Sequence, residues 1–366
     1  MTDGWCAHCK THVKRLQAHY AKCPVILRVV QLWEQTYFSL DVNIWPDPNE
    51  IHSPDVDVET VTQRLHEINS GEVRILQPTG FEFQVTKFQR DVVEYRRQLF
   101  ADNDRIPLQE RHFTQYAAII TGIHTVGLLF PSTAPGPVYV EFGAGRGYLA
   151  HFLSDLREDA DVLLLERQAY RFKAERSLKG RSGSVSRLRI DIKDVVLSEV
   201  PQLVGRDFIG IGKHLCGAAT DMALRACFTP RQKSLQHKRC AIGFAVATCC
   251  HHRCTWDSYV NRSYLAKLGF HRSCFSALVK ISSWATLDAS QVREVQDVGS
   301  ANGLTWQNKR RLGCLAKDLI DTGRVKWAES LGWEGRLLTY IDSSISPESR
   351  LVLIYKSSSS TGDLIK

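Results

Sequence analysis

Three glycines at alternate positions mark the segment EFGAGRG at residues 141–147, between an apolar run and a helical pattern. The glycines are Gly143, Gly145 and Gly147. Glycine lets the backbone turn sharply and lets a ligand approach without a Cβ in the way. Glu141 stands just before the glycines, and Glu166 ends the next predicted strand. A carboxylate at that second position can accept both ribose hydroxyls of a nucleoside ligand.

The spacing of the glycines indicates which nucleoside. Dinucleotide dehydrogenases use G-x-G-x-x-G, which sets a helix N-terminus against a pyrophosphate. G-x-G-x-G after a strand that ends in an acid is typical of doubly wound methyltransferases, which bind S-adenosylmethionine. The cationic amino-acid end of that ligand suits Glu141. Asp191 ends the third predicted strand and can accept from the adenine amino group. The alternatives are a strand-to-helix turn without a ligand, and a helix cap at Asp191.

Two clusters of titratable side chains follow later strands: KHLCG at residues 213–217 and CCHHRC at residues 249–254. In an open α/β sheet, ligands bind at the carboxyl ends of the strands, so both clusters should face the cleft of the glycine loop. The candidate catalytic residues are Lys213, His214, His251 and His252. Cys249, Cys250 and Cys254 are either small buried hydrophobes or a structural metal site.

Four soft ligands lie near the N-terminus: Cys6, Cys9, His19 and Cys23. His19 and Cys23 are one helical turn apart, so both can face one ion. Tetrahedral zinc is the expected species, and in so small a unit the metal would supply most of the folding energy. The alternative is a loose terminus with incidental cysteines. We predict a zinc finger over residues 1–24.

The elements that position these residues alternate along the chain. Residues 25–130 have a mainly helical pattern, and a domain with alternating strands and helices extends over residues 131–366 with an insertion at about 275–333. Strands are predicted at 138–142, 161–166, 187–191, 207–212 and 241–247. Strands alternating with helices indicate a parallel sheet covered on both faces. Segments 336–341 and 351–355 are too close for a helix between them and form an antiparallel C-terminal hairpin.

The composition indicates which kinds of binding partner and which compartment to expect for this protein. The formal net charge of +8 favours an anionic partner, of which nucleic acid is the commonest. The eleven cysteines, interleaved with histidines and without a secretory signal, favour metal binding in a reducing compartment. No apolar run is long enough to span a bilayer. We therefore expect an intracellular protein, nuclear or cytoplasmic and not secreted, without a membrane and without an obligate protein partner.

The chain resembles the eukaryotic tRNA 2′-O-methyltransferase family that modifies the fourth nucleotide of the acceptor stem. The match covers roughly residues 105–356 and, weakly, the first 23. It is carried by EFGAGRG (141–147), KHLCGAATD (213–221), CCHH (249–252), RHFTQ (111–115), DTGR (321–324) and SPES (346–349). The resemblance implies a doubly wound, Rossmann-like class I methyltransferase fold and ribose 2′-O-methylation of tRNA with S-adenosylmethionine as donor. It also implies a CHHC-type finger, in which His12 is the alternative to Cys9.

The catalytic base stays open at this point. A ribose hydroxyl is a poor nucleophile, so Lys213 with a lowered pKa, or one of the three histidines, would have to deprotonate or position it. We expect His112 and Gln115 to close the cleft and Arg324 to contact the RNA backbone. Two alternative functions remain: a non-catalytic RNA-binding protein with a degenerate methyltransferase fold, and a zinc-dependent hydrolase or deaminase. The deaminase signature H-x-E with a downstream P-C-x-x-C is absent.

Overall fold

The structure is a computed structural model of the 366-residue chain. It describes residues 23–45, 55–70, 110–129, 136–171, 182–229, 241–287 and 305–356, the shorter pieces 4–6, 11–13, 75–76 and 78–80, and the single residues His19, Val92, Glu94, Ala174 and Leu178. Among the helices in these ranges, none is long and apolar enough to cross a membrane.

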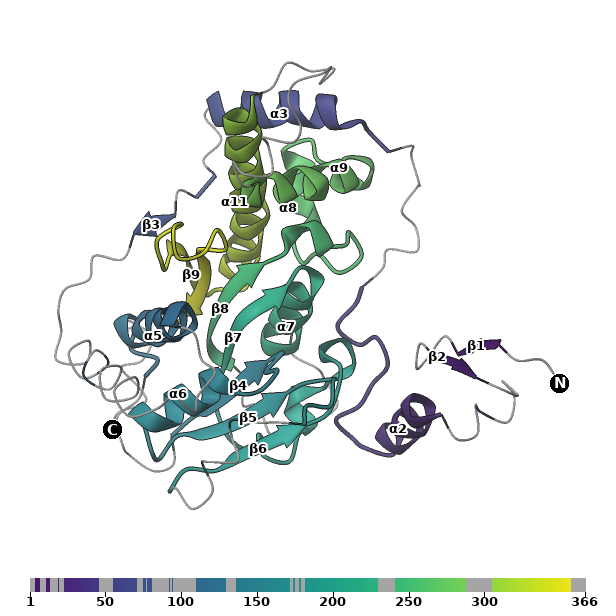
Figure 1. Ribbon diagram of the computed structural model, residues 1–366, viewed down its shortest axis with the longest axis vertical. Helices are drawn as coiled ribbons and strands as arrows, with labels where there is room; N and C mark the ends of the chain where they lie inside the picture. The colour runs from purple at the N-terminus through teal and green to yellow at the C-terminus, as the bar shows by residue number, and fades with distance from the viewer. Residues whose placement is uncertain are drawn as a thin grey trace.

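A mixed sheet lies at the centre of the molecule (Figure 1), with eight strands in the described part of the chain. The strands are β3 (Thr79–Gly80), β4 (Val138–Phe142), β5 (Asp161–Leu165), β6 (Val185–Leu188), β7 (Phe208–Cys216), β8 (Ala241–Cys249), β9 (Glu334–Thr339) and β10 (Arg350–Tyr355). Their order is β3-β9-β10-β8-β7-β4-β5-β6. Strands β8, β7, β4, β5 and β6 are parallel, and β10 is antiparallel to both β8 and β9. The predicted parallel sheet and antiparallel hairpin are confirmed.

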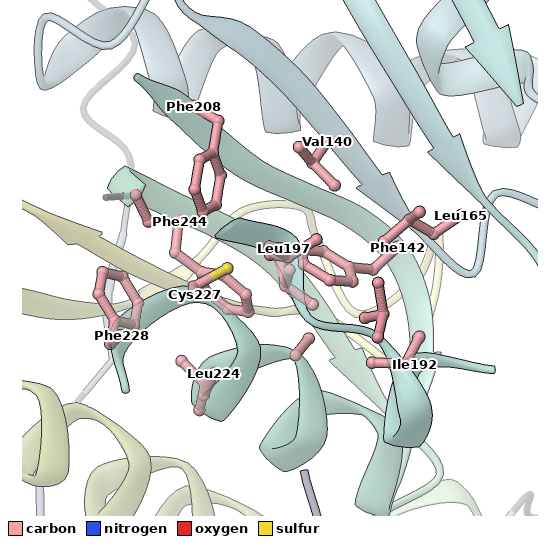
Figure 2. Packing of buried hydrophobic residues seen from close by; sticks show 14 of the residues in the cluster. Val140, Phe142, Leu165, Ile192, Leu197, Phe208, Leu224, Cys227, Phe228 and Phe244 are labelled. Atoms are coloured by element: carbon pink, nitrogen blue, oxygen red, sulfur yellow. The ribbon is translucent and has the colours of Figure 1, made fainter. Parts of the chain in front are cut away.

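Alternate side chains of the strands enter two different cores, one on each face of the sheet. Along β4, Val140 and Phe142 join the first core, whereas Tyr139 joins the second. Helices α7 (Ala218–Phe228) and α11 (Trp306–Ser330) contribute to the first core, and α5 (Glu110–Thr125) and α6 (Tyr148–Leu156) to the second. In the first core, the ring of Phe244 contacts those of Phe142 and Phe228 (Figure 2). Helices therefore cover both faces, as a doubly wound sheet requires.

A third core lies in a helical layer beyond the sheet (Figure 1). It is formed by α3 (Val58–Ser70), α8 (Arg262–Lys267), α9 (Arg272–Ser282) and α11. Leu65 of α3 is fully buried there together with Leu278 of α9 and Leu319 of α11. The insertion predicted near residues 275–333 is thus largely helical where it is described. Helix α3, from the N-terminal region, packs into the same layer.

The N-terminal residues form a short hairpin followed by helical backbone. Strands β1 (Gly4–Cys6) and β2 (Thr11–Val13) pair antiparallel, and Cys23 is buried immediately before α2 (Pro24–Trp33). His19 is helical and half-buried. Cys9 and the side chains of Cys6 and His12 lie outside the described residues. The zinc finger stays a prediction.

A fully buried arginine joins α11 to the start of α7. Arg324 Nη2 donates to Asp221 Oδ2 at 2.6 Å, and Nη1 donates to Asp321 Oδ1 at 2.8 Å. The same guanidinium donates to the carbonyl of Gly217 at 3.1 Å. The side chain of Arg324 has no exposed surface. The expected contact of Arg324 with RNA is therefore wrong, because its donors are directed into the protein interior.

Asp321 extends this ion-pair network to β8 and to the short 3₁₀ turn η4 (His251–Arg253). Its Oδ2 accepts from Thr248 Oγ1 at 2.8 Å and lies 2.9 Å from His251 Nε2. Burial alone would raise the pKa of Asp321, but His251 and Arg324 hold it well below the usual value. Buried charges on Arg324 and Asp321 thus join α11 to α7, β8 and η4.

Truncation of Arg324 should destabilise the fold without acting through RNA. Arg324→Ala leaves the buried carboxylate of Asp221 without its cation and that of Asp321 with His251 alone, a loss of about 3–5 kcal/mol. Lys326→Ala, on the same helix, removes an exposed ion pair with Glu329 and should cost no more than about 1 kcal/mol. Urea unfolding curves measure both changes. A normally stable Arg324→Ala protein with weakened tRNA binding would restore a surface role for this arginine.

Candidate active site

The glycine segment forms the turn between β4 and α6. Gly143, Gly145 and Gly147 all have positive φ angles, of 61°, 52° and 80°. Residues with a Cβ rarely adopt this left-handed region, so glycine at these positions permits the turn. The turn brings the backbone of the loop to the carboxyl ends of β4 and β5, where a nucleoside ligand of an open α/β sheet binds.

Two buried carboxylates flank this loop. Glu166 Oε2 accepts from Gly145 N at 2.9 Å, and its Oε1 accepts from Gln168 N at 2.7 Å. Glu141 Oε2 accepts from Ala150 N, in the first turn of α6, at 3.0 Å. Each carboxylate oxygen can accept a second hydrogen bond, so both groups remain able to bind a ligand. The structure therefore brings Glu141, Glu166 and the glycines together as the sequence pattern predicts.

Asp191 lies beyond the end of β6. Its Oδ1 accepts from Lys193 N at 3.2 Å and so caps the 3₁₀ turn η2 (Ile192–Asp194). Its Oδ2 accepts from Arg167 Nη1 at 3.3 Å. The side chain is about one quarter exposed. The structure thus gives Asp191 the role of a cap, and its contact with a ligand stays a proposal.

Strand β7 is longer than predicted and contains the first titratable cluster. Lys213 pairs with Ala247 of β8, and Leu215 pairs with Thr248, so His214 is an extra residue in the ladder. His214 has a φ of 57°, which is uncommon for a residue with a side chain. A bulge of this kind bends a strand and redirects its side chains, and bulges are frequent beside active sites.

Lys213 contacts two residues in the N-terminal half of α5. Its Nζ is 3.0 Å from His112 Nδ1 and 4.2 Å from the centroid of the Tyr116 ring. Burial lowers the pKa of Lys213 to about 8, although the negative charge of Glu141 acts in the opposite direction. The amine therefore loses its proton in the range just above neutral pH, well below the pH at which a free lysine does so. Gln115, whose Oε1 is 3.3 Å from His112 Nδ1, completes this contact between α5 and β7.

The three candidate histidines occupy different environments. Burial, and then the charge of Lys213, lowers the pKa of His214 to about 4, which keeps its imidazole neutral. His252 is exposed on η4. The side chain of His251 has no exposed surface and is paired with Asp321. His251 is thus placed to hold η4 in position, whereas Lys213, His214 and His252 retain access to solvent.

Three thiols meet at the ends of β7 and β8. The Sγ atoms of Cys216, Cys249 and Cys250 all lie within 4.8 Å of one another, and those of Cys216 and Cys249 are 3.3 Å apart. The hydrogen bond from Cys249 lowers the pKa of Cys216 to about 6, whereas the same contact and burial raise the pKa of Cys249. Cys254 instead contacts Arg324 Nη2 at 3.3 Å. Sequence reasoning grouped Cys254 with Cys249 and missed Cys216, which only the pairing of β7 with β8 could reveal.

Comparison with known proteins identifies relatives. The family model described as "Methyltransferase TRM13" matches residues 114–355. A protein of Mus musculus named "tRNA:m(4)X modification enzyme TRM13 homolog" is 31% identical over 66% of this chain and 63% of its own length. Its Homo sapiens counterpart is 30% identical over 69% of this chain and 66% of its own length. A Scheffersomyces stipitis protein named "tRNA:m(4)X modification enzyme TRM13" is 28% identical over 92% and 84%.

The chain thus spans slightly less than two thirds of the length of its mouse and human relatives. Among solved structures, the plantazolicin methyltransferase BpumL with SAH aligns with 82% of this chain and 98% of its own, at 9% identity and a TM-score of 0.29. A likeness this loose adds nothing to the argument. The family match covers most of the sheet, including β7 with Lys213 and the three thiols at the ends of β7 and β8, and it begins within α5. The chain belongs to the TRM13 methyltransferase family.

Proposed function

We propose that this protein transfers a methyl group from S-adenosylmethionine to the ribose 2′-hydroxyl of the fourth nucleotide in the tRNA acceptor stem. The observation that carries the proposal is the position of Lys213, a partly buried amine of lowered pKa on the strand next to the one that leads into the glycine loop. The names of the relatives, which describe modification of tRNA, support the substrate. Ribose as the acceptor and the acceptor-stem position rest on the resemblance of the motifs.

The donor site is the glycine loop. S-adenosylmethionine supplies an electrophilic methyl group on its sulfonium. Glu166 would accept from the ribose hydroxyls of the ligand, and Asp191, beyond the end of β6, would accept from its adenine. Glu141 and Gly147 belong to the part of the loop that would hold the cationic amino-acid end. The negative charges at Glu141 and Glu166 suit a ligand that carries a net positive charge.

A substitution in the loop tests the donor site. Gly145→Asp places a Cβ and a carboxylate where φ is 52° and where Gly145 N donates to Glu166. We expect S-adenosylmethionine affinity to fall by at least tenfold, which is about 1.4 kcal/mol. Gly205→Asp is the matched control, because Gly205 also has a positive φ, 71°, but precedes β7 at the opposite end of the strand. Calorimetric titration measures both. Equal affinity in the two variants would place the donor elsewhere.

The acceptor side is formed by β7, η4 and α5. The neutral amine of Lys213 would accept the proton of the 2′-hydroxyl as the methyl group passes from the sulfonium sulfur to the ribose oxygen, because that oxygen is a poor nucleophile while protonated. His112 and Tyr116 contact the amine and hold its position. His214 and His252 are placed to position the nucleotide, and His251 holds η4 through Asp321.

A pH–rate profile distinguishes a base from a positioning group at Lys213. Since the neutral amine is the reactive form, turnover should rise with pH and level off above about 8, the pKa of Lys213. Lys213→Ala should lower turnover by about 10²–10⁴-fold and remove this limb. Lys280→Ala, an exposed lysine on α9, should leave the profile unchanged. A small loss in Lys213→Ala that is independent of pH would assign positioning only.

The acceptor nucleotide is tested directly. The chain is incubated with labelled S-adenosylmethionine and total tRNA, and the methylated nucleotide is mapped. We expect one labelled 2′-O-methyl group, at the fourth nucleotide of the acceptor stem. Label on a base, or at another position, would contradict the assignment. Binding of S-adenosylmethionine with no methylation of any tRNA would favour the non-catalytic RNA-binding alternative.

Binding of tRNA involves surfaces outside the cleft. The formal net charge of +8 favours attraction of the phosphate backbone. The predicted finger would hold zinc through Cys6, Cys9, His19 and Cys23, with His12 as the alternative to Cys9. The β1–β2 hairpin, the helical backbone at His19 and the buried Cys23 are consistent with such a unit. We assign it a role in docking tRNA and none in the chemical step.

A further inference from the structure

The cluster of Cys216, Cys249 and Cys250 is not used by the methyl-transfer scheme. Cys216 is the last residue of β7, Cys249 is the last residue of β8, and the two are paired across the sheet. Cys250 follows at once with its backbone in the left-handed region, at φ 48° and ψ 46°. This conformation is costly for a residue with a Cβ. Cys250 adopts this conformation at the position where its side chain supplies the third thiol of the cluster.

The backbone around the thiols is tightly held. Gly217 N donates to the carbonyl of Cys249 at 3.0 Å. A Cβ on Gly217 would lie 2.6 Å from the carbonyl carbon of Arg253, so only glycine lets η4 approach β7 this closely. On the other side, Cys250 N donates to Glu348 Oε1 at 3.0 Å, and Lys317 contacts the other oxygen of Glu348. The backbone that carries the three thiols is therefore held in place by the fold itself.

The spacing of the sulfur atoms fits a single metal ion. A zinc–sulfur bond of about 2.3 Å gives a separation of about 3.8 Å between two sulfur ligands of a tetrahedral ion. The three Sγ atoms lie within 4.8 Å of one another, so small side-chain rotations bring all three to that distance. The 3.3 Å between Cys216 and Cys249 is far longer than a disulfide bond of about 2.0 Å.

Packing alone does not account for the cluster. Cys249 is almost fully buried, but Cys216 and Cys250 are only half-buried. Cysteines that serve as small hydrophobes are typically among the most buried side chains. Partial exposure also provides a path by which an ion enters. We propose that Cys216, Cys249 and Cys250 bind one zinc ion at the carboxyl ends of β7 and β8.

Binding of zinc has a defined chemical balance. The three thiols give up their protons to solvent and coordinate as thiolates. Three protein ligands leave one position of a tetrahedral ion for a ligand from outside the cluster. The ion would link the end of β7, which carries Lys213, to η4, which carries His252. The site is separate from the predicted finger and does not depend on the proposed methyl transfer.

Zinc content per chain tests the site in the full-length protein. Cys216→Ser and Cys250→Ser should each lose one equivalent of zinc relative to the wild type. Cys314→Ser, which changes a half-buried cysteine on α11 outside the cluster, should keep the wild-type content. Cys23→Ser removes a ligand of the predicted finger and should leave the zinc of the cluster bound. Wild-type zinc content in both cluster variants overturns the proposal.

A second measurement leaves the sequence intact, since a serine variant can unfold. The wild-type chain is treated with iodoacetamide before and after a chelator removes zinc, and the alkylated cysteines are mapped by mass spectrometry. We expect Cys216 and Cys250 to react only after chelation, whereas Cys314 reacts equally in both samples. Equal reaction of Cys216 and Cys250 in both samples, or a disulfide between Cys216 and Cys249 in the zinc-loaded chain, overturns the proposal. Neither readout depends on methyl transfer.

Discussion

The ion pairs of Arg324 are the constraint on which the carboxyl ends of β7 and β8 depend. A guanidinium with no exposed surface is tolerated only when its charge and its donors are all matched. Asp221, Asp321 and the carbonyl of Gly217 supply that match from α7, α11 and the end of β7. Asp321 then holds Thr248 and His251. A shift of any of these segments would leave a buried charge without its partner. The segments are therefore held together as one unit.

The fully buried Arg324 and the partly buried Lys213 have opposite pKa shifts because different groups surround them. Arg324 faces two carboxylates, which keep its charge and raise its pKa further. Lys213 faces an imidazole and an aromatic ring, with Glu141 acting on it at longer range, so burial dominates and lowers its pKa. The carboxylates around Arg324 stabilise a permanent charge, which suits a structural role. The surroundings of Lys213 yield an amine that can accept a proton near neutral pH, which suits chemistry.

Local patterns were sufficient to predict the glycine loop and the two elements that flank it. Strand β4 and helix α6 have the predicted bounds because an apolar run, three glycines and an amphipathic helix follow one another directly. Roles that depend on tertiary contacts were not accessible. Arg324 looked like a surface cation because its partners lie up to about a hundred residues away along the chain. Cys216 was overlooked for the same reason, since its neighbour Cys249 comes from another strand.

The position of β10 has a consequence for how the chain is made. This strand, near the end of the sequence, lies between β8 and β9 and has four fully buried apolar side chains, Leu351 to Ile354. Strand β9 is connected to β8 only through β10, so it cannot join the sheet until residues 350–355 have left the ribosome. Until then the backbone edge of β8 that pairs with β10 has no partner strand. Insertion of β10 between β8 and β9 is thus a non-local step that follows the synthesis of both neighbouring strands, and steps of this kind slow folding and prolong the exposure of unpaired strand edges.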